Sequence, residues 1–167
     1  ITDQRRAESE YSDLFNNATE GIFRSSPGGR LMRANPALVR MHGFETEAEL
    51  LESISSLDTD WYVYPEDRER LVRRLQRDGR VDNYEFLMRC RATGECIWVN
   101  ENARAVYDDE GAIAYFEGTV LDITEKRRLE AEYRDIFDNV GEGMYRSTPD
   151  GQLVRANRAL ARLQGMD

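Results

Sequence analysis

The sequence predicts an α+β domain in which a five-stranded antiparallel sheet carries helices on one face and amphipathic helices flank it at both ends. Two observations predict this class. Short runs typical of strands form one hairpin early in the chain and three consecutive strands later, and three helical segments lie between the two groups. Consecutive hairpins favour antiparallel pairing, and helices grouped in this way cover one face of a sheet.

The first expected elements are a helix and a β-hairpin. Apolar residues within 4–18 recur mostly at spacings of three and four, which is the helical period. Residues 22–25 and 31–34 are short strand-like runs, and the Ser, Pro and Gly residues of 26–29 separate them. The sequence therefore predicts a helix that leads into two strands joined by a tight turn.

Two capped helices are expected next. Asn35 stands before Pro36, and this pair is typical of a helix N-cap followed by proline at the first helical position. It predicts a helix over 37–41. Thr46 is the corresponding cap expected for a second helix over 46–52.

The next segment, 53–64, shows no clear periodicity and is expected to be irregular. A stronger helix is predicted from Pro65 to Asp78, with leucine and valine on one face and an acidic pair in its first turn. Acidic side chains are favourable there because the N-terminus of a helix carries partial positive charge.

Three strands complete the predicted sheet. Residues 84–88 alternate between apolar and polar side chains, and 97–107 and 112–123 are long strand-like runs. Turn residues separate them at 93–94 and 108–111. The three strands should therefore form a meander of two hairpins.

An internal repeat dominates the chain. Residues 1–45 align without gaps to residues 123–167, and 24 of the 45 positions are identical. The identity runs through turns and glycines as well as helical positions, which chance similarity between two helices would not produce. An offset of 122 residues is the length of a small domain with its linker rather than of a solenoid repeat.

Composition excludes several classes of function. The formal charge is −9, with 32 acidic and 23 basic residues, whereas nucleic-acid binding needs a concentrated basic face. No apolar run approaches the ~20 residues of a membrane span. Cys90 and Cys96 are too few for a disulfide framework, so a reducing cytoplasmic compartment is expected. We expect both cysteines to be small buried residues, with a thiol switch as the alternative.

Several motifs in this order resemble the PAS domain, the sensor module of bacterial signalling proteins. They are Gly21-Ile22-Phe23, Arg33-Ala34-Asn35, Tyr64-Pro65-Glu66-Asp67-Arg68, Thr93-Gly94 before Trp98-Val99, and Gly118 to Thr124 with its Asp-Ile-Thr ending. Thr93 departs from the pattern, since many relatives carry Asp before the turn glycine. The resemblance implies one full PAS copy and a truncated second copy in tandem.

The resemblance and the repeat together predict four parts. These are an N-terminal flanking helix over 1–20, a complete PAS domain over 21–124, an inter-domain linker helix over 125–140, and the N-terminal fragment of a second PAS domain over 141–167. Units below ~40 residues rarely bury enough surface to be stable. We therefore expect 141–167 not to fold independently.

PAS domains enclose a pocket that holds haem, flavin, a small acid or nothing in different members, so the cofactor is unknown. Haem is not expected, because the resemblance places its histidine ligand on the helix over 65–78, which has none; His42 is elsewhere. Photoactive flavin is not expected, because 50–62 lacks the required cysteine. Phosphate-loop, zinc-protease and serine-hydrolase motifs are missing as well, so we expect no catalysis by these residues.

The predicted ligand pocket lies between the inward face of the sheet and the irregular segment. Its candidate residues are two apolar strand stripes and two aromatic residues: Tyr84, Phe86, Met88, Phe116, Gly118, Val120, Trp61 and Tyr62. Neither stripe contains a charge, so we expect a ligand that is small and largely apolar, or no ligand. The alternative that these residues only fill a core stays open.

Signal transmission is expected at the start of the linker helix. Asp122 and Glu125 have the spacing of a capping box with Thr124 between them, and Leu129 and Tyr133 lie on an apolar stripe of the helix. Such a stripe needs cover, which predicts a parallel homodimer through the flanking helices. The stripe could instead pack on its own domain and transmit nothing.

The sequence therefore predicts a sensory PAS module that passes a signal to neighbouring PAS domains and a downstream output domain of histidine kinase or diguanylate cyclase type. The alternative is a ligand-free structural spacer and dimerisation domain.

Overall fold

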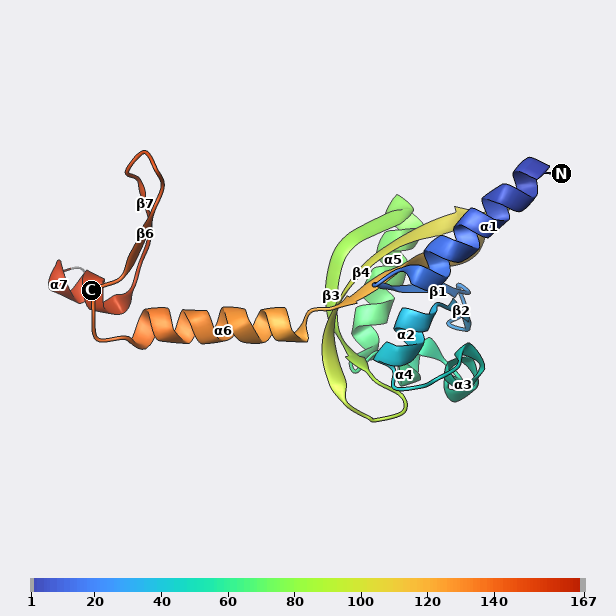
Figure 1. Ribbon diagram of the computed structural model, residues 1–167, viewed down its shortest axis with the longest axis horizontal. Helices are drawn as coiled ribbons and strands as arrows, with labels where there is room; N and C mark the ends of the chain where they lie inside the picture. Colours follow the sequence, from blue (N-terminus) through green and yellow to red (C-terminus); the bar gives the residue numbers. More distant parts are fainter. Residues whose placement is uncertain (1, 166–167) are drawn as a thin grey trace. The chain divides into compact units, whose positions relative to one another are not determined.

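The computed structural model describes residues 2–165 and divides into two compact units, residues 1–124 and 125–167 (Figure 1). The first unit contains a five-stranded sheet and five helices among the described residues. In chain order the elements are α1 (Thr2–Asn17), β1 (Gly21–Ser25), β2 (Leu31–Ala34), α2 (Pro36–Met41), α3 (Glu47–Ser53), α4 (Leu57–Asp60), α5 (Pro65–Asp78), β3 (Arg80–Arg89), β4 (Cys96–Tyr107) and β5 (Ile113–Asp122). The predicted α+β class is confirmed.

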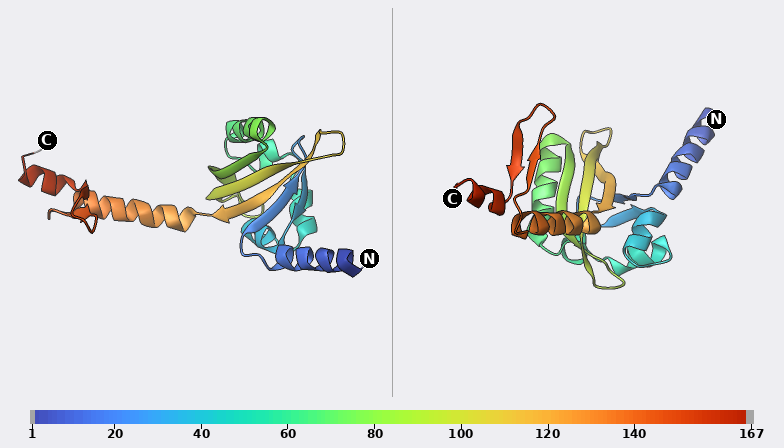
Figure 2. Two further views of the ribbon diagram at one scale, coloured as in Figure 1. Left: turned by 90° about the horizontal axis from the view of Figure 1, so that it is seen from above. Right: turned by 60° about the vertical axis from the view of Figure 1, so that its left-hand side comes forward.

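The sheet has the strand order β2-β1-β5-β4-β3, and all neighbouring pairs are antiparallel. The last strand, β5, therefore lies in the middle of the sheet, where Gly118 is paired with Phe23 on one side and with Ala103 on the other. Along β4 every second residue from Ile97 to Ala105 is buried, as the two-residue period of a strand requires. Helices α2 to α5 pack on this buried face (Figure 2).

Gly118 allows β4 and β5 to approach closely. A Cβ atom at this position would lie 2.0 Å from the backbone oxygen of Asn102 and 2.8 Å from the Cα of Ala103. Real Cβ contacts are never so short, so the strand pair requires glycine here.

Local capping accounts for the ends of the predicted helices. The Asn35 side chain accepts a hydrogen bond from the Leu38 backbone N–H at 3.0 Å, and Pro36 begins α2. Thr46 and Glu49 form a complete capping box at the start of α3. These contacts satisfy N–H groups that the first turn of a helix leaves without partners.

The segment predicted to be irregular contains one helical turn, α4. The Trp61 backbone N–H bonds to Leu57 O at 3.1 Å, and Tyr62 forms an isolated antiparallel bridge with Met88 of β3. The side chains of Trp61 and Tyr62 are buried. The prediction missed this turn because pairing with β3, rather than a local period, orders the segment.

The loop between β3 and β4 is longer than the turn expected at 93–94. The last strand pair joins Arg89 to Cys96, and the Cys90 N–H bonds to Glu95 O at 2.7 Å. Adjacent strand positions face opposite sides, so Cys90 is buried and Cys96 is exposed. The expectation that both cysteines are buried is wrong for Cys96.

The second unit contains α6 (Thr124–Asn139), which begins at the last residue of the first unit, then β6 (Tyr145–Ser147), β7 (Leu153–Ala156) and α7 (Arg158–Leu163). β6 and β7 form an antiparallel hairpin. Asn157 caps α7 by accepting a hydrogen bond from the Leu160 backbone N–H at 2.9 Å. Residues 166–167, part of the predicted second PAS fragment, lie outside the described residues, as does residue 1.

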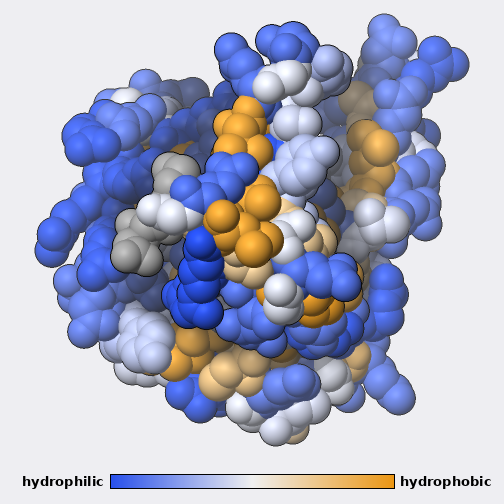
Figure 3. Space-filling model, turned by 90° about the vertical axis from the view of Figure 1, so that its left-hand side faces the viewer, coloured by the Kyte–Doolittle hydropathy of each residue, from blue (hydrophilic) through white to orange (hydrophobic). Residues whose placement is uncertain are grey.

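Large apolar side chains are exposed on this unit. Figure 3 shows hydrophobic patches in orange among hydrophilic side chains in blue. The exposed set is Leu129, Tyr133, Ile136, Met144, Tyr145, Leu153, Val154 and Leu163. No helix among residues 2–165 is both long and apolar enough to cross a bilayer.

Candidate ligand cavity

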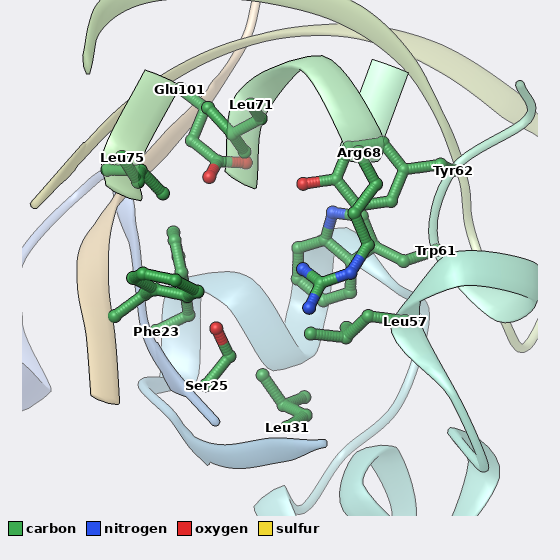
Figure 4. Close-up of a pocket in the computed structure, with 11 residues that line it drawn as sticks. Phe23, Ser25, Leu31, Leu57, Trp61, Tyr62, Arg68, Leu71, Leu75 and Glu101 are labelled. Carbon is green, nitrogen blue, oxygen red and sulfur yellow. The ribbon is translucent and has the colours of Figure 1, made fainter. Parts of the chain in front are cut away.

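A small internal cavity lies between the buried face of the sheet and the helices α4 and α5 (Figure 4). Its open volume is about 10 Å³, which is about the room needed by one water molecule. The lining residues come from both strand hairpins and from the helices: Phe23, Ser25, Leu31, Leu57, Trp61, Tyr62, Arg68, Leu71, Leu75, Glu101 and Phe116. Most of this wall is apolar, and four polar side chains face the same space (Figure 4).

Arg68 enters the cavity wall from α5 because it is one helical turn before Leu71 and two before Leu75, on the buried face of the helix. Its side chain is only 7% exposed and forms an ion pair through Nε with the Asp58 carboxylate of α4. The Asp58 side chain is 54% exposed. Arg68 therefore carries a buried charge whose partner is at the surface.

Glu101 enters from β4, where it occupies the buried register between Val99 and Ala103. The residue is 2% exposed. Burial raises the pKa of the Glu101 carboxyl to about 8, and the nearby charge of Arg68 opposes the rise. A buried carboxylate is costly without a partner, so the group is protonated at neutral pH and is a hydrogen-bond donor.

Two hydroxyl groups complete the polar lining. Tyr62 and Ser25 are buried, and their hydroxyls point into the cavity with the Glu101 carboxyl (Figure 4). Burial raises the pKa of the Tyr62 hydroxyl well above its usual value, and the Glu101 charge contributes to the rise. Tyr62 therefore stays protonated.

The structure brings together three of the eight predicted pocket residues, Trp61, Tyr62 and Phe116. The other five lie beside the cavity or within the core. Phe86, Met88 and Val120 are buried in the core, and Gly118 is at the close approach of β4 and β5. Tyr84 is half-buried, and its hydroxyl donates to Asp67 O at 2.9 Å.

Two charged residues that belong to neither predicted stripe, Arg68 and Glu101, also line the cavity. Sequence reasoning considered the stripes of β3 and β5 and left out the stripe of β4. Glu101 could have been recognised in the sequence, because it is an acidic residue in the apolar register of Val99 and Ala103. An arginine at helical spacing from Leu71 and Leu75 was the signal for Arg68.

The sequence model described as the PAS fold matches residues 31–120, which is more than half of the chain and includes β2, β3, β4 and most of β5. The chain belongs to the PAS fold family.

A curated relative of this PAS chain is the sensor histidine kinase TmoS of Ectopseudomonas mendocina, which is 27% identical over 128 residues. The match covers 74% of this chain and 12% of that kinase, so the chain spans about one eighth of its relative's length. A sensory box histidine kinase/response regulator from Burkholderia thailandensis E264 is 25% identical, with a TM-score of 0.52 over 75% of this chain and 92% of that one.

An RNA-binding Light-Oxygen-Voltage receptor has the same fold, with a TM-score of 0.61 and 21% identity over 80% of this PAS chain and 38% of that chain. None of the side chains that line the cavity here is a cysteine. Among residues 2–165 there is also no cluster of three His, Cys, Asp or Glu side chains that would hold a metal ion.

The predicted signal residues lie at and beyond the end of the last strand of the PAS sheet. Thr124 Oγ1 accepts a hydrogen bond from the Trp98 backbone N–H at 3.0 Å, and Asp122 Oδ1 accepts one from the Thr124 N–H at 2.9 Å. The predicted capping box is wrong. Helix α6 begins at Thr124, and both oxygens of Glu125 accept hydrogen bonds from Arg128, one turn later.

On α6, Leu129 and Tyr133 are about half exposed, and the ring of Tyr133 stacks on that of Phe137 at 5.9 Å. The exposed stripe also includes Ile136. These positions leave apolar surface available on the helix that follows the PAS sheet.

His42 is a second buried titratable group, outside the cavity lining. Its ring is 4.6 Å from that of Trp61, and its Nδ1 accepts a hydrogen bond from the Arg91 N–H at 3.3 Å. Its Nε2 is buried without a partner among the described residues. Burial lowers the pKa of His42 to about 4, and the charge of Arg91 contributes. The ring is therefore neutral at physiological pH.

Proposed function

We propose that this chain is a sensory module of a multi-domain, cytoplasmic bacterial signalling protein, which binds a small ligand in its cavity and transmits a signal through the flanking helices. The observation that carries the proposal is the convergence of Arg68, Glu101, Tyr62 and Ser25 on one buried space. Buried polar groups are costly unless they are partnered, and a pocket with a few such groups in an apolar wall is typical of ligand sites.

The output domain would be of the histidine kinase or diguanylate cyclase type and would follow in the complete protein. The similarity to TmoS and to a sensory box histidine kinase supports the first type. The chain itself would have no catalytic step. Asp122, Thr124, Glu125, Leu129 and Tyr133 would connect the sheet to the next domain.

The second unit would be the opening part of a second PAS domain in tandem, with 125–140 as the linker and 141–167 as the fragment. Its local geometry supports this. Tyr11 and Phe15 stack at 6.0 Å, as Tyr133 and Phe137 do at 5.9 Å. A guanidinium lies over the phenylalanine ring in each copy, at 4.9 Å for Arg33 and 4.6 Å for Arg155.

The test of ligand binding is native mass spectrometry with an absorbance spectrum of the purified chain. We expect a bound small molecule without the visible bands of haem or flavin. The sensory proposal would be contradicted if the chain carried no molecule, both as purified under native conditions and after incubation with cell extract.

A ligand-free spacer and dimerisation domain is the second candidate, and the exposed stripe of α6 together with the small cavity volume favours it. We propose a parallel homodimer through the flanking helices in either case. Leu129→Glu should convert the dimer to a monomer in light scattering, and Lys126→Glu, on the polar face of α6, is the matched control. A monomeric wild-type chain would overturn the proposed dimer.

A further inference from the structure

A surface hollow lies directly outside the internal cavity, and one side chain separates the two spaces. All the residues that line the cavity are buried. The hollow has a volume of about 310 Å³ and is lined by residues of the β1–β2 turn, of α4 and of α5: Pro27, Asp58, Pro65, Arg68, Glu69, Val72 and Arg73. Arg68 is the residue that the two linings share. Its side chain therefore forms the wall between the cavity and the surface.

Arg68 has a partner on each side of this wall. On the surface side, its Nε forms an ion pair with the Asp58 carboxylate, whose side chain is 54% exposed. On the cavity side, a hydrogen bond from Arg68 opposes the rise in the pKa of the Tyr62 hydroxyl. Gly29 of the β1–β2 turn leaves room for the guanidinium, because a Cβ there would lie 3.4 Å from Arg68 Nη2. The guanidinium thus occupies the space between the turn and α5 (Figure 4).

We propose that Arg68 is a gate, which closes the internal cavity in this structure and opens it to the surface hollow when its side chain rotates outward. The inference rests on the cavity being the ligand site of the proposed function. The cavity alone has a volume of about 10 Å³, enough for about one water molecule, so a larger molecule enters only if part of the wall moves. The hollow outside is at the lower end of the range of small-molecule sites, roughly 300–1,000 Å³.

Arg68 is better suited to move than the rest of the wall that the helices provide. The other helical side chains of the cavity lining are apolar: Leu57, Leu71 and Leu75. Turning any of these outward would expose apolar surface to water, which is unfavourable. The guanidinium of Arg68 instead regains hydration at the surface, because its side chain is only 7% exposed in the closed position. A long side chain can also change rotamer without a change in the backbone.

The ion pair with Asp58 holds the gate closed. Because the Asp58 side chain is 54% exposed, solvent screens the attraction between the two charges. Such a pair is weak, so Arg68 can leave it at a small cost in free energy. Salt weakens an exposed pair further, and we therefore expect the gate to open more often at high ionic strength.

The experiment measures the quenching of Trp61 fluorescence by acrylamide in the full chain with Trp98→Phe. Trp61 lines the cavity and is 2% exposed, and Trp98 is the only other tryptophan of the chain. Acrylamide is larger than a water molecule, so it reaches this ring only when the cavity opens. Arg68→Ala should raise the quenching constant about three-fold or more. Arg73→Ala, which lines the hollow but not the cavity, should leave it unchanged.

Asp58→Asn keeps the inference falsifiable if Arg68→Ala does not fold. This change at an exposed carboxylate leaves Arg68 in place without its ion-pair partner, and quenching should rise about two-fold. An increase from about 0.05 M to about 1 M salt should raise quenching in the Trp98→Phe chain but not in Asp58→Asn. Val39→Ala, a core truncation outside the cavity lining, shows what a loss of stability does by itself, and its quenching should stay low.

The gate would be overturned if Arg68→Ala and Asp58→Asn quench like the Trp98→Phe chain, or if Arg73→Ala or Val39→Ala raises quenching as much as they do. The same data separate this inference from the proposed function, because quenching needs no ligand. If the gate fails and mass spectrometry finds a bound molecule, the sensory proposal stands. If quenching depends on Arg68 and Asp58 as expected but no molecule binds, the gate stands and the sensory proposal fails.

Discussion

Asn35 and Asn157 are 122 positions apart and make the same three hydrogen bonds. Each side chain accepts from the backbone N–H three residues later, at 3.0 and 2.9 Å, and from the one thirteen residues earlier, at 2.8 and 2.9 Å. Each also donates to the carbonyl fifteen residues earlier, at 3.0 and 2.8 Å. The turn and helix start are therefore specified within a segment of about 20 residues, independent of what surrounds it.

Burial differs sharply between the same two regions. Leu31 is 5% exposed and its counterpart Leu153 is 61% exposed; Phe23 is 6% exposed and Tyr145 is 66% exposed. In the first unit β1 is paired with β5 and its hairpin is covered by helices. Local hydrogen bonds can thus form the hairpin, whereas removal of its apolar face from water depends on distant strands.

The largest effect that would sharpen this comparison is expected from Asn35→Ala. The substitution leaves several buried backbone groups without partners, which should lower the free energy of unfolding of the first unit by about 3–5 kcal/mol. Urea denaturation followed by tryptophan fluorescence measures this unit, since Trp61 and Trp98 both lie in it. The matched variant Asn157→Ala should change that transition by less than about 0.5 kcal/mol. Equal losses in the two variants would contradict the comparison.

A second matched pair tests burial directly. Leu31→Ala removes a core side chain and should cost about 2–4 kcal/mol in the same urea transition, while Leu153→Ala should cost almost nothing because its side chain is exposed. A large loss for Leu153→Ala would show that the second hairpin is covered in solution, for instance by another copy of the chain.

The two copies of the repeat should respond differently to acid, because the position of His42 in the first copy is occupied by Gln164 in the second. Its folded pKa of about 4 lies below the unfolded value of 6.5, so its contribution to stability is present above pH 6.5 and is lost as pH falls toward 4. Because of His42, the free energy of unfolding of the wild-type chain should be about 2 kcal/mol lower at pH 5 than at pH 7.5. His42→Gln should abolish this difference. Thermal unfolding of both proteins at the two pH values measures the difference, and parallel pH profiles would contradict it.

The smallest effect concerns the chain between the two regions. Asp122→Ala removes the hydrogen bond to the Thr124 N–H and should weaken the start of α6 by about 1 kcal/mol. Hydrogen exchange of the Thr124 amide should become about five-fold faster. Asp109→Ala, in the exposed turn before β5, is the control. An unchanged Thr124 rate would leave Asp122 without a role at the helix start.

The comparison also explains what could be predicted from the sequence. Asn35-Pro36 and Thr46 act within a few residues, and their helices begin where these caps indicate. Helix α4 and the cavity pair Arg68 and Glu101 depend on contacts between segments far apart in the chain. An arginine or glutamate in an apolar register does not reveal its partner until α5 is packed on β4.

The close approach at Gly118 limits how a ligand could move the sheet. Its Cβ would lie 2.0 Å from Asn102 O, and the four nearest residues along β5, from Phe116 to Val120, all carry a Cβ. Sliding β5 past β4 by one or two positions would bring one of those atoms against this carbonyl. Strands β4 and β5 can twist against each other while their register is kept, but they cannot shift past each other by one or two residues. A helix that follows β5 would therefore receive a change of angle rather than a displacement along its axis, and amides across β4 and β5 should stay protected from exchange when ligand binds.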